Sequence, residues 1–258
     1  MKESNTRFVG KVLYHLPEVP STNAFALELL SKTKPAEGTV ISAYHQTHGR
    51  GQIGSSWESA PGENLALSFI FYPGFLAPVR QYLLGKIFAL AARDLIGAYI
   101  PSKPAFVKWP NDIIVGAQKI GGILIQNSIQ GEKLQYTVAG IGLNINQRYF
   151  QQYDPPATSL TLEAGETFAT DQLRDELCAR IEVYYESLRD GAYQWIDQMY
   201  LKHLMMLDQP AVFQRQSNQE TFEGYIRGVS DSGLLIVERQ GIPETFGLKE
   251  IRLLTFSN

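Results

Sequence analysis

The sequence predicts an α+β protein that ends in a small β-barrel. Strand and helix patterns alternate through about the first 200 residues, whereas the chain after Leu207-Asp208-Gln209-Pro210 contains only short strand patterns. A length of 258 residues, with 44% hydrophobic and 19% charged residues, is typical of a globular protein with an ample core. We therefore expect two domains, residues 1–205 and residues 206–258.

The first half of the chain shows strands and helices by their apolar spacing. A short strand is followed by Ser21, a residue type that commonly caps a helix. A β-branched run and an apolar run then indicate two strands, and a long stretch carries apolar residues at helical spacing. The expected elements are, in order, strand 13–20, helix 24–30, strand 38–43, strand 64–72 and helix 81–96.

The second half is interpreted in the same way. Residues 106–129 resemble a hairpin that turns near residues 116–118, residues 135–146 form a strand, and residues 170–201 are helical. A turn at Asp231-Ser232-Gly233 separates two strands of the C-terminal domain. The four or five short strands expected there include 211–214, 221–229, 234–238 and 249–255.

Charge and composition exclude several classes of function. The net charge is −3 and no Lys/Arg-rich run occurs, so binding to nucleic acid is not expected. No stretch of 18 apolar residues occurs, and residues 1–5 contain no apolar signal, so we expect neither a membrane span nor export. The single cysteine, Cys178, lies in a helical pattern and is expected to be a buried thiol of a cytoplasmic protein.

The most informative segment is the glycine loop, residues 46–57, which reads Gln-Thr-His-Gly-Arg-Gly-Gln-Ile-Gly-Ser-Ser-Trp. Its three glycines allow positive φ and a close approach of backbone N–H groups to a ligand. Arg50 offers a fork of donors suited to carboxylate or phosphate, and Trp57 offers a flat apolar face. The loop lacks the lysine of a Walker motif. A flexible hairpin connection is the alternative interpretation.

Three further polar clusters interrupt the apolar framework. They are Ser21-Thr22-Asn23, the stretch 108–122 with Lys108, Asp112 and Lys119, and Gly140-Ile141-Gly142-Leu143-Asn144. Each also has a plain structural explanation: helix capping for the first, solvated surface charge for the second, and strand packing or a bulge for the third. The four histidines, His15, His45, His48 and His203, have no metal-site spacing and are expected to be loop or core residues. No Ser-His-Asp order indicates a nucleophile.

Taken together, these motifs resemble the catalytic module of biotin protein ligases. The matching stretches are Ser21-Thr22-Asn23, Gln46-Thr47-x-Gly49-Arg50-Gly51, Trp57, Asn64-Leu65, Lys108-Trp109-Pro110-Asn111-Asp112, Lys119-x-Gly121-Gly122-Ile123-Leu124 and Gly140-x-Gly142-x-Asn144. They follow the family order through roughly the first 150 residues. The resemblance implies a mixed, mainly antiparallel sheet flanked by helices, followed by an SH3-like barrel that helps to engage ATP or the acceptor.

The resemblance also implies an activity and its partners. ATP and biotin would react to biotinyl-5′-AMP with Mg²⁺, and the biotinyl group would pass to one lysine of a biotin carboxyl carrier protein, such as that of acetyl-CoA carboxylase. A homodimer is the assembly to be tested. Lys119 and Arg50 would be the catalytic cations, because they neutralise the repulsion between the carboxylate of biotin and the α-phosphate.

The residues implied by the resemblance divide into three sets. Those expected to bind biotin are Ser21, Thr22, Asn23, Gln46, Gly49, Arg50, Gly51, Lys119 and Gly122. Those expected to bind ATP or the adenylate are Arg50, Gln52, Trp57, Lys108, Asn111, Asp112, Lys119 and Asn144, with Trp57 stacking on adenine. Asp112 and Asn144 are the metal ligands implied.

Two departures from the family pattern affect these expectations. Many members carry a second arginine after the Gly-Arg-Gly triplet, where this chain has the neutral Gln52, so the adenylate is held by Arg50 and backbone alone or leaks more readily. The first motif begins at residue 21, so we expect no N-terminal DNA-binding domain and no repressor role. The alternatives are a lipoyl or octanoyl transferase of the same fold and a non-catalytic biotin-sensing protein.

Overall fold

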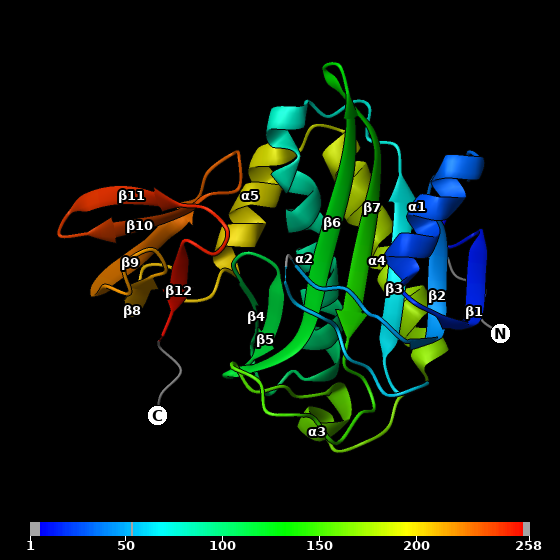
Figure 1. Cartoon of the computed structure of the whole chain (residues 1–258), viewed down its shortest axis with the longest axis horizontal. Coiled ribbons are helices and arrows are strands. Elements are labelled where there is room, and N and C mark those ends of the chain that lie inside the picture. Colours follow the sequence, from blue (N-terminus) through cyan, green and yellow to red (C-terminus); the bar gives the residue numbers. More distant parts are fainter. Residues whose placement is uncertain (1–5, 53, 255–258) are drawn as a thin grey trace.

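A seven-stranded sheet forms the larger part of the molecule (Figure 1). The computed structural model describes residues 6–52 and 54–254. Three parts of the sequence predictions lie outside the described residues: the absence of a signal in residues 1–5, Ile53 of the glycine loop, and the end of the strand expected over residues 249–255. The strands of the seven-stranded sheet are β1 (Leu13–Val19), β2 (Thr39–Gln46), β3 (Leu65–Phe71), β4 (Ala105–Lys108), β5 (Asp112–Val115), β6 (Gln118–Gln130) and β7 (Lys133–Leu143). They lie in the order β1-β2-β3-β7-β6-β5-β4, and only β1 and β2 run parallel, which confirms the mixed, mainly antiparallel sheet.

Helices cover both faces of this sheet. They are α1 (Thr22–Lys32), α2 (Tyr82–Tyr99), α3 (Leu160–Ala164), α4 (Thr170–Arg189) and α5 (Tyr193–Lys202), with a short 3₁₀ turn at Pro78–Arg80. Helix α1 packs with Ile41, Ile70 and Val138 on one face. The alternate residues, such as Phe69 and Phe71, join the main core with α2 and α4 on the other face. Since α1 covers only part of its face, the rest is available for a binding site.

The sequence predicts one helical stretch over residues 170–201, whereas the structure has two helices there. Helix α4 ends at Arg189 and α5 begins at Tyr193, because Gly191 between them has φ +79° and cannot continue a right-handed helix. Helix α3 was not predicted. Cys178 lies buried on α4 as expected, and burial raises the pKa of its thiol to about 12.

The C-terminal strands form a second, five-stranded antiparallel sheet. They are β8 (Pro210–Arg215), β9 (Thr221–Val229), β10 (Leu235–Arg239), β11 (Ile242–Phe246) and β12 (Ile251–Leu253), in the order β11-β10-β9-β8-β12. Among the described residues no ladder joins the edge strands β11 and β12, so the expected barrel is observed as an open sheet. The indole N–H of Trp109 donates to the Gly233 carbonyl at 2.9 Å, and one apolar core runs through both sheets. The domain boundary near residue 205 stays a prediction.

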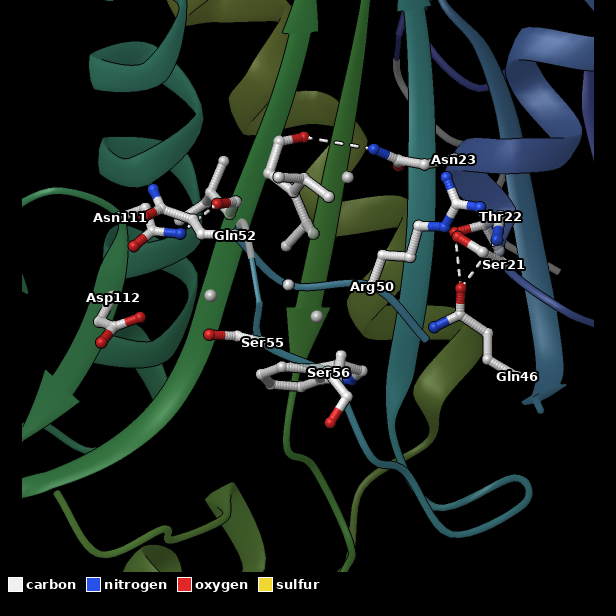
Figure 2. Close-up of a pocket in the computed structure, with 18 of the residues that line it drawn as sticks. Ser21, Thr22, Asn23, Gln46, Arg50, Gln52, Ser55, Ser56, Asn111 and Asp112 are labelled. Carbon is white, nitrogen blue, oxygen red and sulfur yellow. Dashed lines mark hydrogen bonds between the residues drawn. The ribbon is translucent and has the colours of Figure 1, made fainter. Parts of the chain in front are cut away.

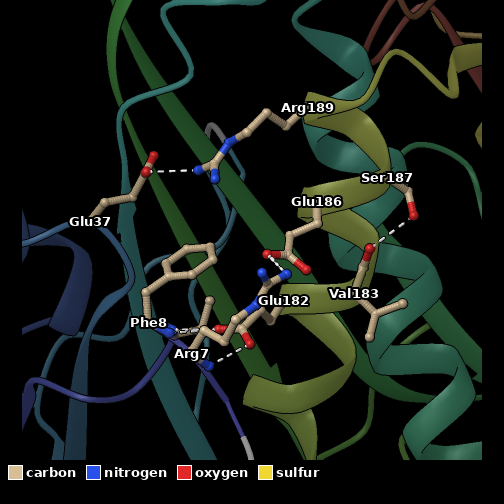
Figure 3. A network of polar contacts seen from close by, with 9 residues as sticks. Arg7, Phe8, Glu37, Glu182, Val183, Glu186, Ser187 and Arg189 are labelled. Carbon is tan, nitrogen blue, oxygen red and sulfur yellow. Dashed lines mark hydrogen bonds and ion pairs between the residues drawn. The ribbon is translucent and has the colours of Figure 1, made fainter.

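The start of the described chain is fastened to helix α4 (Figure 3). The Glu182 carboxylate accepts the backbone N–H groups of Arg7, Phe8 and Val9 at 2.6, 2.8 and 2.9 Å. Burial alone would raise the pKa of Glu182, but these three donors outweigh it and lower the pKa. Among the described residues no helix has the length and apolar character needed to span a membrane.

Candidate functional site

A cavity of about 230 Å³ lies between the glycine loop, the start of α1 and the open part of the sheet (Figure 2). The residues that line it come from segments far apart in the sequence. They are Ser21, Thr22, Asn23, Gln46, Arg50, Gly51, Gln52, Ser55, Ser56, Trp57, Leu67, Pro110, Asn111, Asp112, Lys119, Gly122, Ile123, Leu124, Gly140, Ile141 and Gly142. The sequence clusters therefore converge on one site. Of the predicted site residues, Gly49, Lys108 and Asn144 are not part of its lining.

The end of the cavity near α1 is formed by uncharged polar side chains, which the guanidinium of Arg50 approaches from the glycine loop (Figure 2). Ser21 is the N-cap residue of α1, but its side chain makes no capping hydrogen bond. The Oε1 atom of Gln46 caps the helix instead, accepting the backbone N–H of Thr22 at 2.8 Å and its hydroxyl at 3.1 Å. The hydroxyl of Ser68 on β3 lies 2.7 Å from the hydroxyl of Thr22 and 2.5 Å from Oδ1 of Asn23. All these side chains except Gln46 are buried, so their orientations are fixed.

Two glycines of β7 make room for side chains on this face of the sheet. A Cβ on Gly140 would stand 2.4 Å from Oδ1 of Asn23, and a Cβ on Gly142 would stand 2.3 Å from the indole of Trp57. The amide of Asn23 then donates to Oε1 of Gln126 at 3.0 Å. The glycines of this motif are therefore required by close packing of the site itself, and the alternative of plain strand packing does not account for them.

The glycine loop closes over the cavity as a small hairpin. The backbone N–H of Trp57 donates to the Gly49 carbonyl at 2.9 Å, and the backbone N–H of Gly51 donates to the Ser55 carbonyl at 3.0 Å. Arg50 and Ser56 form an isolated antiparallel β-bridge through their backbones. A Cβ on Gly49 would stand 2.2 Å from the Trp57 carbonyl oxygen. Figure 2 shows the side chain of Arg50 extending from this loop toward Ser21 and Thr22.

The indole of Trp57 forms the floor beneath the loop. Three of its ring atoms lie 2.3–2.7 Å from the position of a Cβ on Gly142, and a fourth lies 3.6 Å from that on Gly122. Its Nε1 is a buried donor without a hydrogen-bond partner among the described residues. An unpaired buried donor costs free energy, so this N–H is available to an acceptor on a ligand.

The opposite end of the cavity carries a pair of oppositely charged side chains. The ammonium of Lys119, near the start of β6, lies 2.6 Å from a carboxylate oxygen of Asp112, the first residue of β5. The backbone of Lys119 is fixed on both sides, since its N–H donates to Pro156 and its carbonyl accepts from Thr158. Lys108 is the backbone partner of Asp112 in the ladder of β4 and β5. Burial lowers the pKa of the Lys108 ammonium, the nearby carboxylate of Asp112 raises it, and the charge of Lys119 lowers it further.

The two predicted asparagines have mainly structural contacts. The amide of Asn111 donates to the Ile123 carbonyl at 2.6 Å, which ties the turn before β5 to β6. Asn144 is buried and its amide donates to the Thr158 carbonyl at 2.9 Å. Roles for Lys108 and Asn144 toward a nucleotide stay predictions.

Sequence reasoning missed Ser68 and Gln126, which hold the polar end together, and Ser55 and Ser56 of the loop. The available signal for Ser68 was a single hydroxyl within the apolar strand Leu65–Phe71. None of the four histidines lines the cavity. The prediction that they are loop or core residues is wrong for His15, which is exposed on β1, and for His45, which is partly exposed on β2.

A second cavity adjoins the first across Gln52, Pro110 and Asn111. Its far side is formed by two turns of the C-terminal sheet, through Ser232-Gly233-Leu234 and Gly247-Leu248. Gln52 therefore lies between the two cavities.

The model of the biotin/lipoate A/B protein ligase family matches residues 16–144, half of the chain, which include the glycine loop and both strands that carry the charged pair. The chain belongs to the biotin/lipoate A/B protein ligase family. The match spans β1 to β7, so it covers the cavity as built above.

Members of this family with similar sequences include two bacterial proteins. The bifunctional ligase/repressor BirA of Bacillus spizizenii is 27% identical over 250 residues, which cover 93% of this chain and 75% of that protein. The biotin–[acetyl-CoA-carboxylase] ligase of Paracoccus denitrificans is 29% identical over 239 residues, which cover 88% of this chain and 96% of that protein. A solved structure of the Aquifex aeolicus biotin protein ligase in complex with biotin and ATP aligns with a TM-score of 0.76 at 23% identity, covering 94% of this chain and 98% of that one.

Proposed function

We propose that this member of the biotin/lipoate ligase family is an ATP-dependent biotin ligase. It would join biotin to ATP as biotinyl-5′-AMP and then pass the biotinyl group to a lysine of a biotin carboxyl carrier protein. The observation that carries the proposal is that one cavity joins a set of buried, uncharged polar side chains to the charged pair of Asp112 and Lys119. The names of the relatives from Bacillus spizizenii and Paracoccus denitrificans agree with a ligase.

The polar end suits the ureido ring of biotin. A neutral urea offers N–H donors and a carbonyl acceptor, and a buried site must satisfy both. Hydroxyl and amide groups of Ser21, Thr22 and Gln46 are of that kind, and the first two are buried. The dithiolane ring of lipoate has no such groups and could not form further hydrogen bonds with these side chains. The cavity therefore favours biotin.

The first step needs positioning and charge neutralisation. A carboxylate oxygen of biotin attacks the α-phosphorus of ATP, a new P–O bond forms, and pyrophosphate leaves. Both reactants are anionic, so the ammonium of Lys119 and the guanidinium of Arg50 lower their repulsion and stabilise the charge of the transition state. No protein nucleophile takes part. In the second step the lysine amine of the acceptor attacks the acyl carbon and AMP leaves.

Mg²⁺ fits this site as an ion held mainly by the nucleotide. Among the described residues no three His, Cys, Asp or Glu side chains gather into a metal site. Asp112 lines the cavity with its side chain 17% exposed, so one carboxylate is placed to meet such an ion. Mg²⁺ commonly binds nucleotide phosphates together with one or two carboxylates, and it would neutralise phosphate charge here. Asn144 lies outside the lining.

The proposal extends to the surroundings of the enzyme. We propose that it acts in the cytoplasm on the carrier domain of acetyl-CoA carboxylase, with no nucleic acid as a partner, and that it assembles as a homodimer. Sedimentation of the purified protein with and without biotin and ATP tests the assembly. A dimer should appear as a doubling of mass, and a monomer under both conditions contradicts this part alone.

The decisive experiment is a transfer assay with competing acids. Purified protein is incubated with ATP, an apo carrier domain and either labelled biotin or labelled lipoate; the control carrier has its acceptor lysine replaced by arginine. We expect label from biotin on the intact carrier only, together with AMP and pyrophosphate. Exclusive labelling from lipoate would identify a lipoyl-type enzyme, and biotin binding without AMP formation would identify a non-catalytic sensor.

A further inference from the structure

Residues 153–158, which we call the connecting segment, lie between β7 and α3 and contact the charged end of the cavity. The Lys119 N–H donates to the Pro156 carbonyl at 2.7 Å, and the Thr158 N–H donates to the Lys119 carbonyl at 2.9 Å. Ala157, between these two contacts, is the parallel β-bridge partner of Lys119. The connecting segment therefore holds the backbone of Lys119 from both sides.

The connecting segment is also attached to the second sheet. The carboxylate of Asp154 forms an ion pair with the guanidinium of Arg252, which lies on the short strand β12. Pro155 and Pro156 follow Asp154 directly, and their rings restrict φ, so this part of the chain is stiff. A displacement of Asp154 is therefore passed on to the carbonyl that accepts the Lys119 N–H.

A third attachment joins the connecting segment to the chain that follows the glycine loop. The hydroxyl of Tyr153 donates to a carboxylate oxygen of Glu58 at 2.6 Å. Burial and the hydrogen bond to Glu58 raise the pKa of Tyr153 to about 12, so its hydroxyl stays protonated and can donate at neutral pH. Adjacent residues, Tyr153 and Asp154, are thus fastened to two different parts of the molecule.

Charges of alternating sign extend from the cavity to the second sheet. Lys119 pairs with Asp112 at 2.6 Å, and Lys108 is the ladder partner of Asp112 on β4. Burial lowers the pKa of the Lys108 ammonium, whereas the carboxylates of Asp112 and Asp154 raise it. The cations of Lys119 and Arg252 lower it further. The ion pair of Asp154 and Arg252 therefore lies close enough to act on the charged end of the cavity.

We propose that Arg252 is a positioning residue for adenylate formation: by holding Asp154 it fixes the connecting segment, and thereby keeps the ammonium of Lys119 in place. The inference rests on the proposed function only for the reaction in which Lys119 acts. The second sheet then contributes to the reaction without a group that touches substrate. Because the side chains of Arg252 and Asp154 are 52% and 66% exposed, their pairing should matter little for overall stability and mainly for the geometry of the site.

The test compares the single-turnover rate of biotinyl-AMP formation in Arg252→Ala and in the unsubstituted protein. An exposed ion pair contributes little free energy, so we expect the rate at saturating biotin and ATP to fall about three- to fivefold. The biotin concentration that gives half of this rate should change by less than about twofold, because the polar end that binds the ring is untouched. Arg252→Lys keeps the charge and should restore most of the rate. An unchanged rate in Arg252→Ala overturns the proposal.

Arg227→Ala is the matched control. Arg227 is another exposed, ion-paired arginine of the second sheet, but its partners are Asp208 and Glu238, which lie outside the connecting segment. Its removal should leave the rate of adenylate formation unchanged. A loss equal to that of Arg252→Ala would mean that the second sheet acts only through general stability, and the proposal would fail.

A double-mutant cycle tests whether Arg252 acts through Asp154. Asp154→Asn should slow the reaction at least as much as Arg252→Ala, since it breaks the same ion pair and also removes a charge near Lys108. The double variant should be no slower than Asp154→Asn alone, because one contact cannot be lost twice. Additive losses contradict the proposed route.

Hydrogen exchange tests the positioning even if no adenylate forms. The amides of Lys119 and Thr158 should exchange faster in Arg252→Ala than in the unsubstituted protein or Arg252→Lys, because the contacts that protect them open more often. The amides of β3 should exchange at the same rate in all three. If no variant forms adenylate while these two amides respond, the proposed function fails and the positioning role stands. Unchanged exchange of both amides overturns the positioning role.

Discussion

The indole of Trp57 lies against Gly142 so closely that a Cβ at position 142 would stand 2.3 Å from the ring. Real Cβ atoms do not approach other atoms so closely, so strand β7 carries glycine here because the tryptophan occupies that space. The same relationship recurs two residues earlier, where Asn23 fills the space above Gly140. The floor of the cavity is therefore set by pairs of a large residue and a glycine.

Gly142→Ala should displace the indole and weaken ATP binding. Because Trp57 is expected to stack on adenine, we expect the KM for ATP in biotin-dependent pyrophosphate exchange to rise about tenfold or more, with a loss of stability of about 1–3 kcal/mol from overpacking. Gly97→Ala is the matched control, since it lies within helix α2 with only the end of Arg93 nearby, and it should stabilise the protein slightly. An unchanged KM for ATP in Gly142→Ala would show that the indole does not touch the nucleotide.

Lys119→Ala should slow adenylation strongly without unfolding the protein. Its ammonium is held 2.6 Å from Asp112 and its side chain is partly exposed, so its loss removes charge from the site and little packing. Loss of one electrostatic donor typically lowers the rate of a chemical step about 10²- to 10³-fold. Single-turnover formation of biotinyl-AMP measures this rate. Lys133→Ala, which removes an exposed lysine at the start of β7, is the control, and equal turnover of the two variants would contradict the assignment.

Much of the site could be predicted because its residues lie in short, chemically unusual stretches. Arg50 stands between two glycines and Lys119 shortly before paired glycines, and both side chains line the cavity, whereas their roles stay predictions. The strands β3 and β7 could also be predicted, since β3 is an apolar run interrupted only by Ser68 and β7 ends in the run Val-Ala-Gly-Ile-Gly-Leu. The local sequence is sufficient to predict a site residue where one short segment contains both the recognisable motif and the side chain that lines the site.

The remaining features depend on contacts between distant segments. Nothing near Ser68 in the sequence shows that its hydroxyl meets Thr22 and Asn23, because that contact arises only when α1 packs on β3. The inward turn of the Asn144 amide toward Thr158 is likewise set by tertiary structure. The break before α5 was missed for a different reason: apolar spacing continues across Gly191, and only its positive φ ends the helix.

Glu182→Gln should lower the free energy of unfolding in a pH-dependent way. The carboxylate accepts three backbone N–H groups, and its folded-state pKa is lower than its ordinary value, so its contribution is fully present above the pKa of the unfolded chain and is lost as pH falls through the folded-state pKa. We expect a difference of about 2 kcal/mol at pH 7 that shrinks below about pH 4. Urea unfolding at several pH values measures it.

Glu186→Gln is the control for this prediction. Glu186 lies one turn further along α4 and pairs with the exposed guanidinium of Arg7, as Figure 3 shows. An ion pair of this exposure contributes little, so its loss should cost under about 1 kcal/mol. Equal effects of the two substitutions would mean that the Glu182 contacts do not anchor the chain.

The ammonium of Lys86 on helix α2 is the basis of a second stability prediction. It is 5% exposed, lies 2.6 Å from Asp197 of α5, and stands 5.5 Å from the ring centres of Tyr82 and Tyr200. Asp197→Ala leaves a buried charge without its partner and should cost about 3 kcal/mol, whereas adding Lys86→Met removes that charge and should recover part of the loss. Urea unfolding of both single variants and the double variant gives the coupling energy. Additive losses would show that the rings of Tyr82 and Tyr200, and not Asp197, hold the ammonium in place.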